Sequence, residues 1–370
     1  MNGLFSALQL RGLTLPNRIV VSPMCQYCAV DGLANSWHVA HLTQLAISGA
    51  GMLTIESTAV EPDGRITPGD LGLWSDETEA ALGAVIRAIC DNSRIPVTLQ
   101  LAHAGRKASS YEPWRGGQLI PAAEGGWDTV APSAIPHKEG ETAPVNLSKA
   151  DIAGLRDAFV ASTLRAVRLG VDALELHGGH GYLIHQFLSP ISNQRTDEYG
   201  GPLENRMRFL LEIFDAVRDA WPQERPLGVK LSASDWVEGG LDIDATVAIS
   251  RALKAHGADW VVSSSGGISP LQKIAPAPGY QVPFATRVKR ETGLISTAVG
   301  LITDPRQADQ IIRSGEADLV AIARALLNDP RWPWRAAAEL GAKLAAPPQY
   351  WRALPQGHAD IFENLVFGAR

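Results

Sequence analysis

Hydrophobic residues along the chain gather in eight short runs that are separated by longer amphipathic stretches. The runs cover residues 18–24, 51–57, 96–103, 173–177, 226–232, 260–265, 295–300 and 319–324. Most are continuously apolar rather than alternating, which is typical of strands buried on both faces of a parallel sheet. Between them, apolar residues recur at steps of three or four, as at Ile152, Leu155 and Phe159. This spacing indicates helices with one buried face.

Eight strands alternating with helices predict an α/β protein with a (β/α)₈ TIM barrel. The alternative is a doubly wound open sheet, which is expected to carry a G-x-G-x-x-G fingerprint after its first strand. Here the first strand ends in Ser-Pro-Met-Cys at 22–25, so the barrel is favoured.

Residues at the ends of the predicted helices support the same division. Ser148 followed by Asp151 resembles a capping box. The pairs Asp304-Pro305 and Asp329-Pro330 are interpreted as N-caps followed by a proline in the first turn. Glycines stand where a helix should end in left-handed backbone, at Gly49, Gly170, Gly257 and Gly315.

One long segment, 106–147, shows no sustained period and is rich in glycine, proline and tryptophan. Loops longer than about 15 residues are usually functional lids or disordered, and the tryptophans favour an ordered lid inserted after the third strand. The stretch 345–370 is also irregular and is interpreted as a C-terminal tail. We expect a single domain over 1–370.

Composition narrows the class of protein. The net charge of −6 is spread along the chain without a basic stripe, which argues against a nucleic-acid partner. No apolar run approaches the ~18 residues of a membrane span, and the N-terminus does not resemble a secretory signal. Three cysteines cannot form a disulfide framework, so we expect a cytoplasmic protein.

Polar side chains concentrate at the predicted strand ends, where barrel enzymes hold their active sites. They are Cys25, Glu56, Ser57, Gln100, His103, His177, Lys230, Ser264, Ser265 and Arg324. The densest group is His177-Gly-Gly-His180-Gly-Tyr182, whose glycines predict a tight turn leaving the strand. Imidazoles can donate to a substrate oxygen and a phenol can deliver a proton. The plainer alternative is that one histidine is structural.

Three further patterns leave alternatives open. The rim histidines could hold zinc for a hydrolase if His103 or Glu56 supplied a third ligand. Cys25 and Cys28 form a C-x-x-C without a second pair, so Cys28 is interpreted as a bystander, while Cys25 could touch a cofactor. Gly300 and Arg324, after the last two strands, predict a phosphate site, unless Arg324 pairs with Asp329.

Longer motifs resemble one known family. They are NRI at 17–19, SPMCQY at 22–27, GRIT at 64–67, QLAHAGRK at 100–107, HGYL at 180–183, SPISNQRTDEYGGPLENR at 189–206 and AVGLITD at 298–304. From about residue 4 to residue 352 the sequence resembles the old yellow enzyme family of FMN-dependent ene-reductases. It is most similar to the subgroup of thermophilic-like bacterial NADPH dehydrogenases and xenobiotic reductases.

The resemblance implies a non-covalent FMN at the barrel mouth. Ser22, Pro23, Met24 and Cys25 would line the flavin, and Cys25 would tune its potential. Ser57 and Gln100 match positions that contact the ring. Lys230 stands where the family usually has arginine, beside the N1/O2 edge of the flavin. Gly300, Ala323 and Arg324 match the phosphate-binding positions, although the family often has glycine at position 323.

The resemblance also implies a ping-pong cycle in which NADPH reduces FMN and an activated alkene then reoxidises it. His177 and His180 would bind the oxygen of an enone, nitro compound or maleimide, with Tyr182 as the proton donor and Tyr27 against the substrate. A tail segment containing Arg352 would reach the neighbouring subunit's site, which implies a homodimer or a dimer-based oligomer. A barrel that binds FMN without turnover is the remaining alternative.

Overall fold

The computed structural model describes residues 3–358 and 360–365. Within these residues, eight parallel strands close into a barrel, because each strand pairs with the next and the last pairs with the first. The strands are β3 (Ile19–Val21), β4 (Met52–Ala59), β6 (Val97–Ala102), β9 (Ala173–Gly178), β10 (Leu227–Ser232), β11 (Trp260–Ser264), β12 (Ile295–Ala298) and β13 (Leu319–Ile322). A two-residue strand, β5 (Leu71–Gly72), pairs in parallel with the end of β4. The predicted barrel is confirmed, and the open sheet was wrong.

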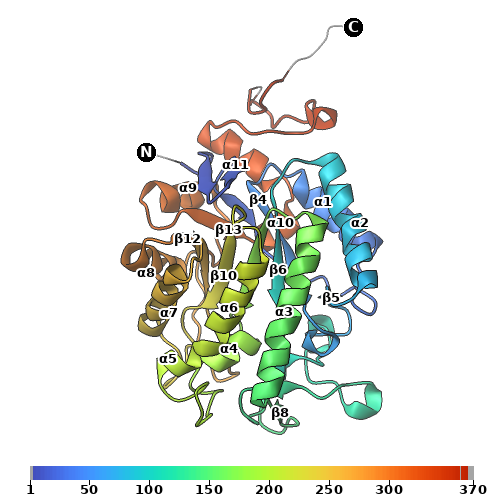
Figure 1. The fold of residues 1–370 in the computed structure, drawn as a ribbon. Helices are drawn as coiled ribbons and strands as arrows, with labels where there is room; N and C mark the ends of the chain where they lie inside the picture. The colour runs from blue at the N-terminus through green and yellow to red at the C-terminus, as the bar shows by residue number, and fades with distance from the viewer. Residues whose placement is uncertain (1–2, 359, 366–370) are drawn as a thin grey trace.

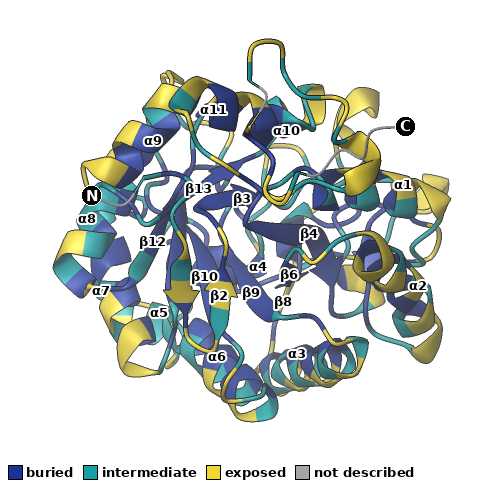
Figure 2. Ribbon diagram, turned by 90° about the horizontal axis from the view of Figure 1, so that it is seen from above, coloured by how far each residue is buried: buried dark blue, intermediate teal, exposed yellow. Residues whose placement is uncertain are grey.

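Helices surround the barrel (Figures 1 and 2). The longer ones are α1 (Ser36–Ala46), α2 (Asp76–Asn92), α3 (Lys149–Leu169), α6 (Arg208–Ala220), α7 (Ile243–Ala255), α8 (Val282–Thr292), α9 (Pro305–Arg313) and α11 (Trp332–Leu340). Shorter helices are α4 (Leu183–Leu188), α5 (Leu203–Arg206) and α10 (Arg324–Asn328). Among the helices of the described residues, none combines the length and the apolar character needed to cross a membrane.

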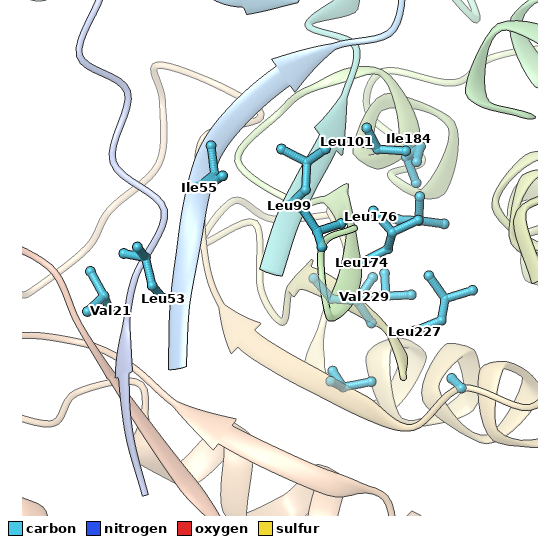
Figure 3. Packing of buried hydrophobic residues seen from close by; sticks show 14 of the residues in the cluster. Val21, Leu53, Ile55, Leu99, Leu101, Leu174, Leu176, Ile184, Leu227 and Val229 are labelled. Carbon is cyan, nitrogen blue, oxygen red and sulfur yellow. The ribbon is translucent and has the colours of Figure 1, made fainter. Parts of the chain in front are cut away.

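Successive side chains along a barrel strand point alternately toward the surrounding helices and toward the barrel interior, so the protein has two separate cores. Leu53 and Ile55 on β4, with Leu99 and Leu101 on β6, belong to the large cluster that fills the space between strands and helices (Figure 3). Their neighbours of opposite parity face the barrel interior. Interior positions near the strand starts include the apolar residues Met52 and Trp260, whereas those near the strand ends include a buried glutamate, Glu56.

An N-terminal hairpin closes the end of the barrel where the strands begin. Its antiparallel strands are β1 (Leu8–Leu10) and β2 (Leu13–Leu15). Leu10 and Leu15 are fully buried in a cluster with Trp260, whose indole fills the space that a side chain at Gly228 would need. The hydrophobic pattern of the sequence did not predict this hairpin.

The lid, residues 106–147, is ordered and lies at the opposite end of the barrel, where the strands end (Figure 1). It contains a parallel pair, β7 (Val130–Ala131) with β8 (Val145–Asn146), and short 3₁₀ turns. Arg106 anchors it by donating to the carbonyls of Ile135 (3.0 Å) and Ile268 (2.7 Å). The described tail residues lie at the other end, beside α11.

Most predicted helix ends are confirmed. Ser148 and Asp151 form a capping box at α3, and the Asp304 side chain accepts from the backbone of Gln307 at α9. The four glycines at helix ends all have positive φ. Asp329-Pro330 was wrong as a helix start: Asp329 ends α10, and α11 begins at Trp332. The Asp329 carboxylate accepts from the Arg331 backbone and bridges the two helices.

Candidate active site

The predicted turn after β9 is present at the C-terminal rim of the barrel. The strand ends at Gly178, and His180 and Gly181 then adopt positive φ values of 54° and 77° before α4 begins. A Cβ at Gly181 would lie 2.0 Å from the carbonyl oxygen of Gly267, so only glycine fits there. The turn therefore brings His180 and Tyr182 back toward the strand end.

Three predicted side chains meet at this turn. The rings of His177 and His180 have centroids 5.1 Å apart, and those of His177 and Tyr182 have centroids 4.9 Å apart. Both pairs are edge-to-face, with interplanar angles of 78° and 86°. His177 is therefore the centre of a three-residue cluster, in contact with the imidazole of His180 and the phenol of Tyr182.

Hydrogen bonds orient both imidazoles. The backbone N–H of Gly179 donates to Nδ1 of His177 at 3.2 Å. Nε2 of His180 lies 2.7 Å from the hydroxyl of Ser264. Burial is the main cause that lowers the pKa of both imidazoles well below 6.5, and the cation of Lys230 adds to it. Both rings are therefore neutral at physiological pH.

The phenol and the rim thiol are both held in their protonated forms. Burial raises the pKa of Tyr182 well above 10 and that of Cys25 well above 9, with nearby acidic groups adding to the effect. Cys25, Tyr182 and Trp127 of the lid pack around a small apolar cluster formed by Ile66, Ala104 and Ala108. The lid therefore contributes an indole beside the proton-bearing groups.

A cavity of about 300 Å³ opens beside His180 between the ends of β10 to β13. Its lining includes seven of the residues expected to contact FMN or substrate: Ser22, Pro23, His180, Lys230, Gly300, Ala323 and Arg324. The Lys230 side chain is buried, and no described residue accepts a hydrogen bond from its ammonium. The Lys230 ammonium is therefore a suitable donor to a negatively charged edge of a flavin ring.

The far end of this cavity suits a phosphate. Gly300 has φ of 112°, and a Cβ there would press on the Gln281 side chain at 3.0 Å. Arg324 is exposed at the start of α10, and the alternative pairing with Asp329 was wrong because Asp329 pairs with Arg335 (3.3 Å). Glycine backbone and an unengaged guanidinium are suitable groups for a dianion, so the residues present fit FMN.

Other predicted residues lie outside this cavity. Met24 packs on the main core, Ser57 is buried on β4, and Gln100 donates to Glu175 at 2.6 Å inside the barrel. The ring of Tyr27 meets lid residue Trp114 edge-on, with centroids 5.8 Å apart. Arg352 belongs to the tail segment, whose residues Trp351 and Leu354 pack beside α11 at the opposite end of the chain's own barrel. Any role for Arg352 at a rim therefore requires a second copy.

The zinc alternative lacks its third ligand. His103 instead bonds Glu61 through Nε2 at 2.9 Å, and Glu56 accepts from the Gln26 backbone at 3.0 Å. In the part of the chain that the structure describes, no three His, Cys, Asp or Glu side chains gather closely enough to hold a metal ion. The imidazole of His38, rather than a second cysteine pair, lies 3.7 Å from the Cys28 sulfur.

Three residues of the site carried no assigned role in the sequence. Gln281 accepts from the Ser265 hydroxyl at 2.5 Å, and it sits in a loop without any motif. Glu175 is buried near Gln100 and Lys230, and strand alternation places it on the same side as His177, which was an available signal. Lys107 donates to the carbonyl of His180 at 2.8 Å. It was visible only as part of a longer motif.

Comparison with known proteins gives the family. Residues 3–343 match the model of the NADH:flavin oxidoreductase / NADH oxidase family. An NADPH dehydrogenase of Geobacillus sp. (strain WCH70) is 45% identical over 351 residues, covering 94% of this chain and 98% of that protein. An NADPH dehydrogenase of Halalkalibacterium halodurans is 41% identical over 352 residues, covering 95% and 98%.

Solved structures agree with this assignment. Morphinone reductase in complex with tetrahydroNAD superposes with a TM-score of 0.76 at 27% identity, covering 98% of both chains. A 2-naphthoyl-CoA reductase complex shares the fold with a TM-score of 0.82 at 22% identity, covering 90% of this chain and 52% of that one. With its barrel, its rim cluster and a family match over nearly its whole length, the chain belongs to the NADH:flavin oxidoreductase / NADH oxidase family, the old yellow enzyme family that its motifs resemble, and is an FMN-dependent oxidoreductase.

Proposed function

We propose that the protein is an NADPH-dependent ene-reductase that reduces activated alkenes such as enones, nitroalkenes and maleimides. The observation that carries this proposal is the edge-to-face cluster of His177, His180 and Tyr182, two neutral donors and one protonated phenol at a single point of the rim. The relatives named NADPH dehydrogenase support NADPH as the reductant.

The two imidazoles would bind the oxygen of the substrate. Because Nδ1 of His177 accepts from Gly179, the proton of the neutral ring belongs on Nε2, which can then donate. The Ser264 hydroxyl can donate to Nε2 of His180, which leaves the ring proton on Nδ1. Two N–H groups on one oxygen withdraw electrons from the conjugated double bond and stabilise the negative charge that develops there.

Tyr182 would supply the proton for the α-carbon. Its raised pKa keeps the phenol protonated, so it can act as the general acid. The chemistry that bound FMN would supply is hydride transfer, from NADPH to the flavin and then to the β-carbon of the alkene. The buried cation of Lys230 would favour negative charge at the ring edge, and Arg324 with Gly300 would hold the phosphate.

We further propose that the assembly is a homodimer, or is built from dimers. The tail segment that carries the candidate substrate residue Arg352 packs beside α11, at the end of its own barrel opposite the rim, so Arg352 would complete the site of a partner. Use of NADPH as the reductant fits the cytoplasmic location expected from the sequence.

An anaerobic titration tests the function. The purified protein should be yellow, lose its flavin absorbance on addition of NADPH, and regain it on addition of 2-cyclohexenone. If NADPH bleaches the flavin and no activated alkene of a broad panel restores it in the absence of oxygen, the proposal of an ene-reductase is wrong.

A further inference from the structure

Two loops of the candidate site touch through their main chains. One is the turn that follows β9 and carries His180; the other follows β11 and contains Gly267. A Cβ at Gly181 would lie 2.0 Å from the Gly267 oxygen, and one at Gly267 would lie 2.4 Å from the His180 oxygen. Both loops have positive φ there, 54° at His180 and 93° at Gly267. The carbonyl oxygens of His180 and Gly267 thus lie close together.

The ammonium of Lys107 lies between these two carbonyls. Its Nζ donates to the oxygen of His180 at 2.8 Å and to that of Gly267 at 3.0 Å. Carbonyl dipoles that point at one place repel each other, and a cation between them converts the repulsion into two charge-assisted hydrogen bonds. The left-handed backbone of His180, which a non-glycine residue adopts at a cost, therefore has a specific partner.

The same ammonium also faces the proposed acid. Its Nζ lies 5.1 Å from the centroid of the Tyr182 ring, within the range of a cation–π contact. Burial, with the nearby cation Arg106, lowers the pKa of Lys107 to about 8, so the side chain is largely charged at pH 7. Among the described residues Lys107 forms no ion pair with a carboxylate, and its hydrogen bonds go to the two carbonyls. A positive charge near a phenol favours release of the phenolic proton.

We propose that Lys107 is a positioning residue of the active site, which clamps the His180 turn against the β11 loop and assists proton release from Tyr182. This inference rests on the proposed function of Tyr182. The competing view is that Lys107 satisfies two carbonyls and only stabilises the fold. The two views differ in whether the effect of Lys107 depends on the presence of the Tyr182 hydroxyl.

Three variants of the FMN-loaded enzyme distinguish these views: Lys107→Met, Lys107→Gln, and Lys254→Met as a matched control, a lysine on α7 that also donates to a backbone carbonyl, that of Thr292 at 2.6 Å. Hydrogen exchange of peptides covering 176–184 and 264–270 reports the clamp. Affinity for 4-hydroxybenzaldehyde, followed by flavin absorbance, reports the oxygen site. The rate at which 2-cyclohexenone reoxidises the reduced flavin without oxygen reports the coupling to the phenol. It is measured for each variant with Tyr182 present and again with Tyr182→Phe added.

We expect Lys107→Met to speed exchange in both peptides and to weaken phenol binding about tenfold, the scale of one lost charge-assisted hydrogen bond. Lys107→Gln should slow reoxidation about tenfold in the Tyr182 enzyme but less than twofold in the Tyr182→Phe enzyme, because coupled residues are not additive. Lys254→Met should match the wild type in all three measurements.

Equal slowing by Lys107→Gln in both backgrounds overturns the assistance to Tyr182, and unchanged exchange overturns the clamp. If the Met variant does not fold, Lys107→Gln, which loses the charge but keeps a donor, decides both points. A wild-type enzyme that neither binds the phenol nor reduces the enone would instead show that the proposed function is wrong, while the exchange measurement would still test the clamp.

Discussion

The ring of His177 stands edge-on to the ring of Tyr182, with centroids 4.9 Å apart and planes at 86°. His177 is the last-but-one residue of β9, whereas Tyr182 is reached only after the turn with left-handed backbone at His180 and Gly181. A rigid strand end and a constrained turn thus hold an imidazole and a phenol edge to face, the two groups that we propose as donor to the substrate oxygen and as proton donor. Their tasks can be separated by substitution.

Tyr182→Phe should slow the alkene-dependent reoxidation of the flavin by about 10²- to 10³-fold, the usual contribution of a general acid. Reduction by NADPH needs no proton from this phenol and should keep its rate. Anaerobic stopped-flow measurement of each half-reaction checks this, with Tyr199→Phe, which removes a hydroxyl bonded to Glu212, as the control. Equal slowing of both half-reactions would show a structural rather than an acid role.

His177→Ala should weaken the binding of 4-hydroxybenzaldehyde about tenfold or more, because one donor to the ligand oxygen is lost. FMN affinity should change little, since the cavity that fits FMN is lined by His180 and not by His177. Spectral titration with the phenol, and ultrafiltration for bound FMN, check the two expectations. His256→Ala, which removes an imidazole paired with Asp215 on the helix layer, serves as the control. Phenol affinity equal to that of the wild type would contradict the role.

The sequence was sufficient for the barrel and for the rim cluster, because both depend on local patterns. Apolar runs mark strands, and three glycines among His177–Tyr182 exclude a helix. The sequence was insufficient to predict features that depend on contacts between segments far apart in the chain. The hairpin at Leu8–Leu15 is buried against residues such as Trp260 that are distant in the sequence. Gln281 belongs to the site through the serines of β11 and its loop and through Gly300.

The error at Asp329 has a local physical cause. An aspartate before proline is a favourable N-cap, but α10 runs up to this residue and the chain needs a turn before α11. The carboxylate therefore accepts from the Arg331 backbone and starts a turn, which the same residue pair also favours. An Asp-Pro pair alone therefore does not distinguish the start of a helix from a turn between two consecutive short helices.

Arg352→Ala tests the proposed contribution across the dimer. The side chain is exposed in the single chain, so its loss should leave folding unchanged. If it completes a partner's site, KM for 2-cyclohexenone should rise about tenfold while light scattering shows the same oligomer. Arg290→Ala, an exposed arginine on α8, is the matched control. An oligomer with unchanged KM would remove Arg352 from the site.

Glu56 gives a pH-dependent prediction for stability. Burial raises its pKa to about 8, opposed by the N–H of Gln26 and assisted by the nearby Asp70. The folded state therefore keeps a proton that the unfolded chain has already released, and the stability from this group falls as pH rises from about 4.5 to about 8.

Glu56→Gln should consequently gain free energy of unfolding relative to the wild type by about 2 kcal/mol or more between pH 5 and pH 8, since each unit of pKa shift is worth about 1.4 kcal/mol. Urea unfolding of both proteins at the two pH values measures this difference. Glu139→Gln, at an exposed position in the lid, should show no such change. A gain that is the same at both pH values would mean that Glu56 is already ionised in the folded protein at pH 5.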